Sequence, residues 1–451
     1  MNQDFSLKYC SSDIYIKNKG LEEIEINTGM TFQNYINLQY KKLNNRLSIN
    51  INNRTITNVM NMYNIHTLNL VNCSLEYVGS LGNTHTLNLS KSRSGYEMYN
   101  SYEEDYTPIQ RRRSIHNPGR GLPFKGVEFL GKVYSLNLSY TDISDEDIKH
   151  LGKCHTLNIS NNEKITDKGI KHLGKVHILD LKNCNKITDE GLKYLEKAHT
   201  LDVTNCNKIT DEGLKYLEKV HTLKLKGCNI TIKGIKYLKK IETLEIEGYN
   251  IPKCEKTLGK IPTLILNDCK KITNTELKYL SNCNTLVLRN GANISCEGIK
   301  YLENVNNLNL SGCNKIMDQD LKYLENCHTL DLSNCCKITD EGLKYLSKCH
   351  TLNLFGCNDI TDKGLKYLGN CYIIYVDASF TKNISQDCIR KMGNVFIQIK
   401  EIRKTPLRVS DYEYSYDKTY WRKYNEEDYT IMFLKKPQYD KNERFEFLGL
   451  E

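Results

Sequence analysis

The chain has 451 residues, of which 39% are hydrophobic, and its formal net charge is +9. The hydrophobic content lies near the usual globular range, which excludes a chain that is disordered throughout. A charge this small for the length does not by itself indicate binding to nucleic acid or to a membrane.

The amino-terminal sequence MNQDFSLKYCSSD lacks the apolar core of a secretory signal, and no run of roughly 18 apolar residues could span a bilayer. We therefore expect an intracellular, cytoplasmic protein. In that compartment its 18 cysteines are expected to be reduced.

Residues 1–65 contain two stretches, LEEIEI and RLSINI, whose alternation predicts short strands. We interpret this region as an amino-terminal cap made of degenerate repeats.

Residues 66–395 are repetitive, and the fifteen residues NCNKITDEGLKYLEK occur at 183–197 and again at 205–219. A period of this size is typical of a solenoid. About 14 units are present, starting at His66, His85, Tyr134, His155, His177, His199, His221, Glu242, Pro262, Asn284, Asn306, His328, His350 and Tyr372.

The unit HTLDVTNCNKITDEGLKYLEKV, residues 199–220, predicts a strand, a turn and a short helix. Leu201 and Val203 alternate with polar residues, as in a strand with one buried face. Leu214 and Leu217 recur at helical spacing. We expect Thr210 and the aspartate that follows it to cap the helix.

One unit cannot bury its apolar side alone, so stacked units are expected to form a parallel sheet backed by short helices. Because helices are wider than strands, the array should curve and place the strands on the concave side. The polar strand residues would then face solvent and leave room for a partner.

The motif V-x-x-L-x-V-x-x-C-x-x-I-T-D-x-x-L-x-x-L, with Val, Cys or Ala at its first position, resembles the cysteine-containing leucine-rich repeat. The resemblance covers about residues 66–395. It is similar to the repeat region of F-box and leucine-rich-repeat proteins, and the verbatim copies resemble the leucine-rich-repeat proteins of large DNA viruses. If the chain is viral, the resemblance implies a place in the host cytoplasm. The resemblance implies a horseshoe of α/β units that binds another protein.

Two columns of the repeat invite a metal-binding interpretation, but both are better read as structural ladders. No C-x-x-C pair is present, and the histidine column at the unit starts also accepts Glu, Pro and Asn. The resemblance implies that the cysteine column satisfies backbone groups of the neighbouring turn. Its members are Cys73, Cys184, Cys206, Cys228, Cys269, Cys313, Cys335 and Cys357.

We expect no enzymatic activity and no cofactor. The common nucleotide-binding, zinc-protease and hydrolase motifs are absent, and aspartates such as Asp189, Asp211 and Asp340 recur in every good copy. A catalytic residue should be singular, whereas helix capping explains a periodic one.

Candidate partner-binding residues lie where the polar strand face departs from its usual Asn, Asp and Ser. An exposed Ile and Val beside charges would resemble an interface core with a polar rim. The candidates are Lys224, Lys226, Glu245, Glu247, Ile265, Val287 and Arg289, with Phe355 and Tyr375 as a second group. Drift in decaying repeats is the alternative explanation.

Two other functions stay open beside a protein-binding scaffold. The chain could be a substrate-recognition subunit of a ubiquitin ligase, binding a ligase adaptor through a diverged F-box in residues 1–65. Alternatively, the lysine stripe on the convex side could bind nucleic acid, although glutamates three residues on offset it. The stripe comprises Lys193, Lys215, Lys236, Lys278, Lys300, Lys322, Lys344 and Lys366.

Two tyrosine-rich segments interrupt or follow the array. Residues 91–126 are an inserted loop, and residues 396–451 form a carboxy-terminal cap or tail in which YNEEDYTIM resembles YNSYEEDYTPI of the insertion. We interpret both as versions of one excursion.

Overall fold

The computed structural model describes residues 65–75, 77–92, 125–247 and 256–377, together with short strands and a few residues outside these ranges. The chain divides into two compact units, Met1–Ile241 and Glu242–Glu451.

The first unit consists of strand–turn–helix repeats in which most helices have a single turn. Its strands are β1 (Tyr15–Lys17), β2 (Ile24–Glu25), β3 (Ser48–Asn52), β4 (Thr55–Ile56), β5 (Thr67–Val71), β6 (Ser74–Leu75), β7 (Thr86–Asn88), β8 (Ser135–Asn137), β9 (Thr156–Asn158), β10 (Ile178–Asp180), β11 (Thr200–Asp202) and β12 (Thr222–Lys224). Its helices are α3 (Asp145–Ile148), α4 (Asp167–Ile170), α5 (Asp189–Leu192) and α6 (Ile232–Ile235), with 3-10 turns η1 (Gly79–Asn83), η2 (Val127–Lys132), η3 (Lys193–Leu195) and η4 (Gly213–Tyr216).

The second unit repeats the same arrangement. Its strands are β13 (Thr243–Glu247), β14 (Thr263–Asn267), β15 (Thr285–Leu288), β16 (Asn307–Asn309), β17 (Thr329–Asp331), β18 (Thr351–Asn353), β19 (Ile373–Asp377), β20 (Phe396–Ile402) and β21 (Tyr429–Phe433). Its helices are α7 (Asn274–Leu277), α8 (Cys296–Ile299), α9 (Asp340–Leu343) and α10 (Asp362–Leu365), with 3-10 turns η6 (Leu258–Lys260), η7 (Lys300–Leu302), η8 (Asp318–Leu324), η9 (Lys344–Leu346) and η10 (Lys366–Leu368).

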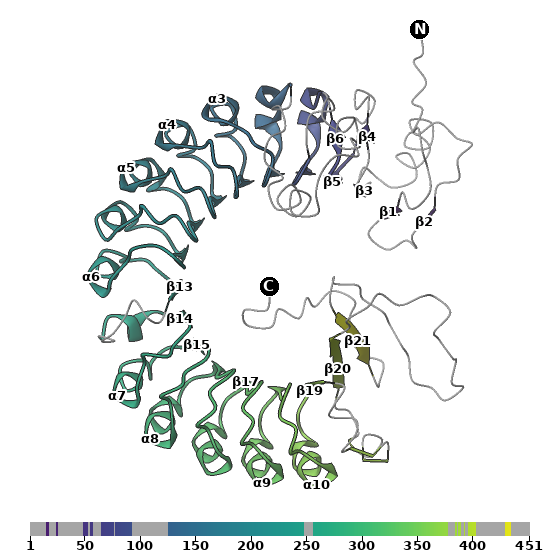
Figure 1. The fold of residues 1–451 in the computed structure, drawn as a ribbon, viewed down its shortest axis with the longest axis vertical. Coiled ribbons are helices and arrows are strands. Elements are labelled where there is room, and N and C mark those ends of the chain that lie inside the picture. Colours follow the sequence, from purple (N-terminus) through teal and green to yellow (C-terminus); the bar gives the residue numbers. More distant parts are fainter. Residues whose placement is uncertain are drawn as a thin grey trace, which may run out of the picture. The chain divides into compact units, whose positions relative to one another are not determined.

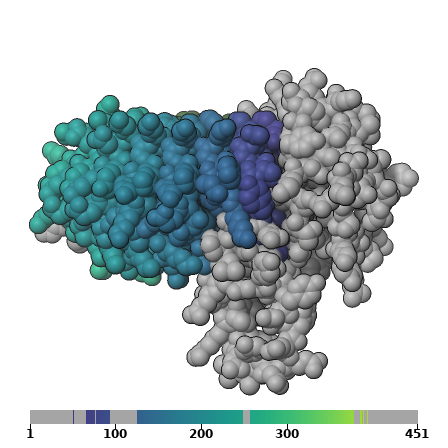
Figure 2. Space-filling view, turned by 90° about the horizontal axis from the view of Figure 1, so that it is seen from above, coloured from purple at the N-terminus to yellow at the C-terminus, as the bar shows by residue number. Residues whose placement is uncertain are grey.

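Within each unit, the repeats stack through parallel strands that lie on the concave side, and the helices lie on the convex side (Figure 1). The register is constant: Leu179 pairs with Leu201, and Leu201 pairs with Leu223. Leu201 and Leu214 have no accessible surface, so the alternating and helical patterns both identify the core correctly. Figure 2 shows successive repeats of the first unit packed against one another in chain order.

The strands expected near the amino terminus are present, because β2 lies in LEEIEI and β3 lies in RLSINI. At the other end, β20 pairs in parallel with β19, and β21 pairs antiparallel with β20. The inserted residues 93–124 and most of 1–64 and 403–451 lie outside the described residues. The assignment of these regions as caps and insertion stays a prediction.

The recurring aspartates do not cap their own helices, which corrects the sequence-based interpretation. In α5 the cap is Thr188, whose hydroxyl accepts a hydrogen bond from the Glu190 amide. Asp189 instead accepts two bonds from the next repeat, from the Thr210 amide at 2.8 Å and from its hydroxyl at 2.7 Å. We call this inter-repeat contact the aspartate clamp.

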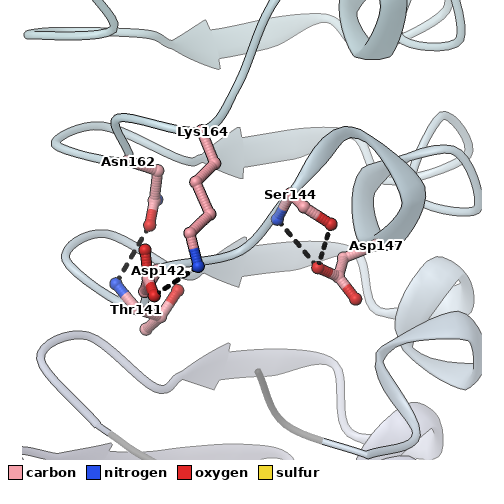
Figure 3. Close-up of polar contacts among 6 residues, drawn as sticks. All are labelled: Thr141, Asp142, Ser144, Asp147, Asn162 and Lys164. Carbon is pink, nitrogen blue, oxygen red and sulfur yellow. Dashed lines mark hydrogen bonds and ion pairs between the residues drawn. The ribbon is translucent and has the colours of Figure 1, made fainter. Parts of the chain in front are cut away.

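Where the preceding repeat supplies no aspartate, another acceptor satisfies the same amide. The Ser295 amide donates to Asn274 Oδ1 of the preceding repeat at 2.9 Å. Elsewhere the acceptor belongs to the same repeat. The Ser144 amide donates to Asp147 Oδ2 at 2.8 Å (Figure 3), and the Met317 amide donates to Asp320 Oδ2 at 2.8 Å. In the second case, Cys296 of the preceding repeat occupies the position that Asp189 has in its own repeat, so no carboxylate is available there for Met317. The amide is therefore satisfied in either way, as the burial of backbone donors requires.

Most of the cysteine column forms the expected ladder, whereas the Cys269 thiol donates to the Leu266 carbonyl of its own repeat. The Cys206 thiol donates to the Leu181 carbonyl of the preceding repeat at 3.2 Å, and the Cys228 thiol donates to the Val203 carbonyl at 3.1 Å. Asn162 fills the same position with a better donor, which reaches the Leu138 carbonyl at 2.9 Å and also accepts from the Thr141 amide (Figure 3). These thiols fill space and satisfy backbone groups.

Candidate functional site on the strand faces

The Asn or Asp that ends most of the three-residue strands has a structural role that the sequence did not reveal. Asp202 Oδ1 accepts from the Thr204 amide at 2.9 Å, and Asn158 Oδ1 accepts from the Ser160 amide at 3.0 Å. A short Asn or Asp is needed to reach an amide two residues on. The usual residues of the concave face therefore turn the chain out of each strand.

Lys224 and Lys226 are the candidate residues that lie in the first unit. Lys224 is the last residue of β12, pairs in register with Asp202 and is half-buried, whereas Lys226 is exposed. A lysine ammonium group cannot accept a hydrogen bond, so Lys224 cannot bond to the backbone amide two residues on as Asp202 does. This repeat therefore differs from its neighbours in hydrogen bonding as well as in charge.

The largest departure lies in the second unit, on a surface that we call the β13–β15 face: Glu245, Glu247, Ile265, Asn267, Val287 and Arg289. Glu245 pairs in register with Ile265, and Ile265 pairs with Val287. Asn267 links the charged residues, because its Nδ2 donates to Glu245 Oε1 at 2.9 Å and its Oδ1 accepts from Arg289 Nη1 at 3.2 Å. The structure thus brings these candidates together.

Asn267 was not among the sequence candidates, although it stands between Glu247 and Arg289 in their column. Its neighbours carry opposite charges, and an amide can bond to both, which is the signal that could have identified it.

The expectation that Val287 is exposed is wrong. Its side chain has no accessible surface, whereas Ile265 is half-buried. Glu247 is also buried, with 7% of its surface accessible, so Glu245, Ile265 and Arg289 offer the reachable part of this face.

A buried polar row continues from Val287 and was not predicted. Asn309, Asp331 and Asn353 follow it in register, with accessible fractions of 1%, 2% and 6%. Asn309 Nδ2 donates to Asp331 Oδ2 at 3.0 Å, and the Ser333 amide donates to Asp331 Oδ1 at 2.8 Å. Burial raises the pKa of the Asp331 carboxyl above its ordinary value.

The second candidate group lies at the end of this row. Tyr375 pairs in register with Asn353, and burial raises the pKa of its phenol to about 12. Phe355 follows β18 and is half-buried. Both therefore lie on adjacent repeats and present partly accessible rings.

The histidines at the unit starts form stacked rows, as expected for a ladder. In the first unit the row runs through His66, His85, Tyr134, His155, His177, His199 and His221, with ring centroids 4.4 to 4.8 Å apart. Several Nδ1 atoms contact the following threonine hydroxyl, for example His199 and Thr200 at 3.3 Å. Among the described side chains, no group of three or more His, Cys, Asp or Glu is arranged to hold a metal ion.

This row predicts that acid destabilises the first unit. Burial lowers the pKa of His177 below its ordinary 6.5, and charges on His199, His155 and His221 lower it further. A lowered pKa means that the unfolded chain binds more protons, so stability is complete above about pH 6.5 and is lost as the pH falls below it. We expect the melting temperature to fall from pH 7.5 to 5.5, and to fall less in His177→Asn. Equal falls in both proteins would contradict this.

Some lysines of the convex stripe form ion pairs, namely Lys193, Lys215 and Lys344, but their partners differ from those expected. Lys193 Nζ lies 2.5 Å from Glu190 and Lys344 Nζ lies 3.2 Å from Glu341, three residues earlier rather than three residues on. The same lysines lie over tyrosine rings, as Lys193 does over Tyr216. Their charge is therefore partly offset within the stripe.

A family model described as "Leucine Rich repeat" matches residues 155–174, 175–195, 199–217, 328–347 and 350–369. These matches coincide with complete strand–turn–helix repeats whose strands pair in parallel. The fold is a leucine-rich-repeat solenoid. The predicted fold class is thereby confirmed, with a parallel sheet backed by short helices.

Solved structures resemble the chain at low identity. They include an internalin, InlF, from Listeria monocytogenes (18% identity, TM-score 0.42, covering 74% of this chain and 88% of that one). The functional domain of InlJ from the same organism, which includes a cysteine ladder, is 16% identical, with TM-score 0.44 and coverages of 75% and 70%. The yeast Rad7 and Elc1 complex is 17% identical, with TM-score 0.37 and coverages of 55% and 81%. No curated protein matches the chain.

In the described part of this leucine-rich-repeat chain, no helix has the length and apolar character needed to cross a membrane.

Proposed function

We propose that the chain is a non-enzymatic scaffold that binds another protein on its strand faces, with the β13–β15 face as the principal site. Solenoid repeats present extended concave surfaces that suit such binding. The observation that supports this choice is the Glu245–Asn267–Arg289 network, which holds both charges beside the half-buried Ile265.

This network prepares the surface for a partner. Because Asn267 bonds to both neighbours, the side chains of Glu245 and Arg289 are oriented before binding, which reduces the entropy lost on association. The fitting partner carries a small apolar side chain for Ile265, flanked by one cation and one anion. Lys224 and Lys226 in the first unit, and Phe355 and Tyr375 in the second, are secondary contacts in this proposal.

The absence of catalysis is part of the proposal. The recurrent carboxylates that might serve as acids or bases are occupied, since Asp189 clamps the next repeat and Asp202 accepts a backbone amide. A group fixed by such bonds in every repeat has a structural role.

The Glu245→Asn/Ile265→Asn/Arg289→Ser variant should lose the partner. It restores the residue types that other repeats carry at these positions, so the fold should tolerate it. We expect partner capture by the tagged full chain from its native cells to fall at least about tenfold, because hot-spot contacts cost 2 kcal/mol or more. Quantitative mass spectrometry of the captured proteins measures this.

A matched control changes the polar strand face of the first unit, as Asp180→Asn/Lys182→Ser/Asp202→Asn. This variant should retain the partner. Equal loss in both variants would place the contact elsewhere. Capture of a cullin and its adaptor with all three proteins would instead support the ubiquitin-ligase function, with the adaptor bound through residues 1–65.

A further inference from the structure

A groove of about 800 Å³ crosses four consecutive repeats of the first unit, at the ends of their helical turns. Its walls come from η1, η2 and the segments that follow α3 and α4. It belongs neither to the strand face nor to the convex lysine stripe, and the proposed function does not use it.

The groove is strongly basic. Its lining includes five lysines, Lys132, Lys149, Lys153, Lys171 and Lys175, and one glutamate, Glu128, which gives a net charge of +4 with the histidines neutral. Lys149 pairs with Glu146 at 2.7 Å. Among the described side chains, the other four lysines form no ion pair, in contrast to Lys193 and Lys344 of the stripe.

This charge arises from a local departure of the repeat. Later repeats carry a glutamate at 196 and 218, where the groove repeats carry glycine. The glycines are required by close approach, because a Cβ on Gly131 would lie 2.2 Å from the His150 carbonyl oxygen, and one on Gly152 would lie 2.1 Å from that of His172. Glycine in place of glutamate also removes the carboxylates from the groove, so that backbone atoms form its floor.

Aromatic rings alternate with the lysines along the groove. Phe129, His150 and His172 occupy one position in successive repeats, and all three are exposed, with 55% of Phe129 accessible. An exposed phenylalanine in a basic groove has no role in binding bare phosphate. Rings of this kind stack with unpaired bases, while the cations between them follow a phosphate backbone.

We propose that this groove binds single-stranded nucleic acid, with the lysines on the phosphates and Phe129 stacked on a base. An acidic protein segment would meet the same charge but would not need the ring. The sequence-based expectation disfavoured nucleic acid because it considered only the convex stripe, where glutamates were expected to offset the lysines.

The test uses the purified full chain and a fluorescein-labelled 20-nucleotide single strand of mixed sequence, measured by fluorescence anisotropy at 50 to 200 mM salt. The variant Lys132→Asn/Lys153→Asn/Lys175→Asn removes three cations. Asn occurs at this repeat position in Asn282, Asn304, Asn326 and Asn370, so the fold should tolerate it. We expect affinity to fall by roughly 10- to 100-fold and the salt slope of log K to decrease by about 2.

Two comparisons isolate the groove. Lys197→Asn/Lys219→Asn/Lys240→Asn makes the same charge change at the same repeat position outside the groove, and it should retain most of the affinity. Phe129→Ser should weaken single-strand binding about tenfold, since stacking contributes roughly 1–3 kcal/mol per base. A duplex of the same sequence, whose base faces are stacked, should bind more weakly.

Several results would overturn the proposal. One is absence of binding at 50 mM salt, and another is equal loss in the two lysine variants, which would indicate bulk charge alone. A third is equal affinity for a poly-glutamate peptide and for the single strand, together with no effect of Phe129→Ser on either affinity. That result would assign the groove to an acidic protein. Circular dichroism melts of each variant must match the native chain for these comparisons to hold.

Discussion

Asp189→Ala is expected to lower the free energy of unfolding by about 2–3 kcal/mol, more than any other substitution of a polar side chain proposed above. Asp189 accepts from both the amide and the hydroxyl of Thr210 in the next repeat. Without it, two donors at a repeat junction lose a charged acceptor. Urea denaturation followed by circular dichroism measures the change.

The control lies one residue away. Glu190 is exposed and pairs only with Lys193 of its own repeat, so Glu190→Ala should cost less than about 1 kcal/mol. Asp189→Asn should lie between the two, because an amide oxygen can still accept one bond but carries no charge. If Asp189→Ala costs no more than Glu190→Ala, the clamp does not stabilise the array.

The ladder thiols are expected to resist alkylation in the native protein. Burial raises the pKa of Cys184 and of Cys228 from 9.0 to about 12, so their thiolate fraction near pH 8 is about a thousandfold lower than that of an ordinary thiol. Cys336 is exposed and should react with iodoacetamide faster than the ladder thiols. Peptide mass spectrometry after timed labelling gives each rate.

Labelling in urea supplies the control for the thiol experiment, because unfolding should equalise the rates of the ladder thiols and Cys336. Native ladder thiols that react as fast as Cys336 would contradict their role in backbone hydrogen bonding, and so would ladder thiols that remain blocked in urea.

The sequence predicted the repeat, the strand positions and the core because each rests on a pattern that every good copy shares. Leu201 and Leu214 are buried where alternation and helical spacing placed them. The aspartate clamp was missed for a physical reason: the cap position and the clamp position are adjacent, and composition cannot tell which repeat supplies the bond. The structure shows that Asp189 accepts a hydrogen bond from Thr210 of the next repeat.

The strand face was predicted in part. Glu245, Ile265 and Arg289 could be recognised from the sequence because they replace the Asn, Asp or Ser usual at their repeat positions. The structure shows that Asn267 bonds to both Glu245 and Arg289. The burial of Val287 could not be predicted from a column of residue types, because burial depends on what packs over the strand face in three dimensions. Strand length was also not predicted. β13, β14 and β19 have no Asn or Asp at their third residue and have five residues, but β5, with Asn69 there, also has five, and β12, with Lys224, has three.

The basic groove was not predicted from the sequence, since its residues are far apart in the chain and belong to four repeats. Its signal was present as a substitution within the repeat, from Glu196 and Glu218 to Gly152 and Gly174. A solenoid aligns the turns of successive repeats as it aligns their strands, so residues at one turn position form a continuous surface.

Hydrogen–deuterium exchange of the full chain, with and without its captured partner, tests the central claim most directly. A partner on the β13–β15 face should slow exchange of amides in residues 243–289 and leave the helices of the first unit unchanged. Slowed exchange confined to convex helices, or to residues 127–175 around the groove, would contradict binding on the strand face.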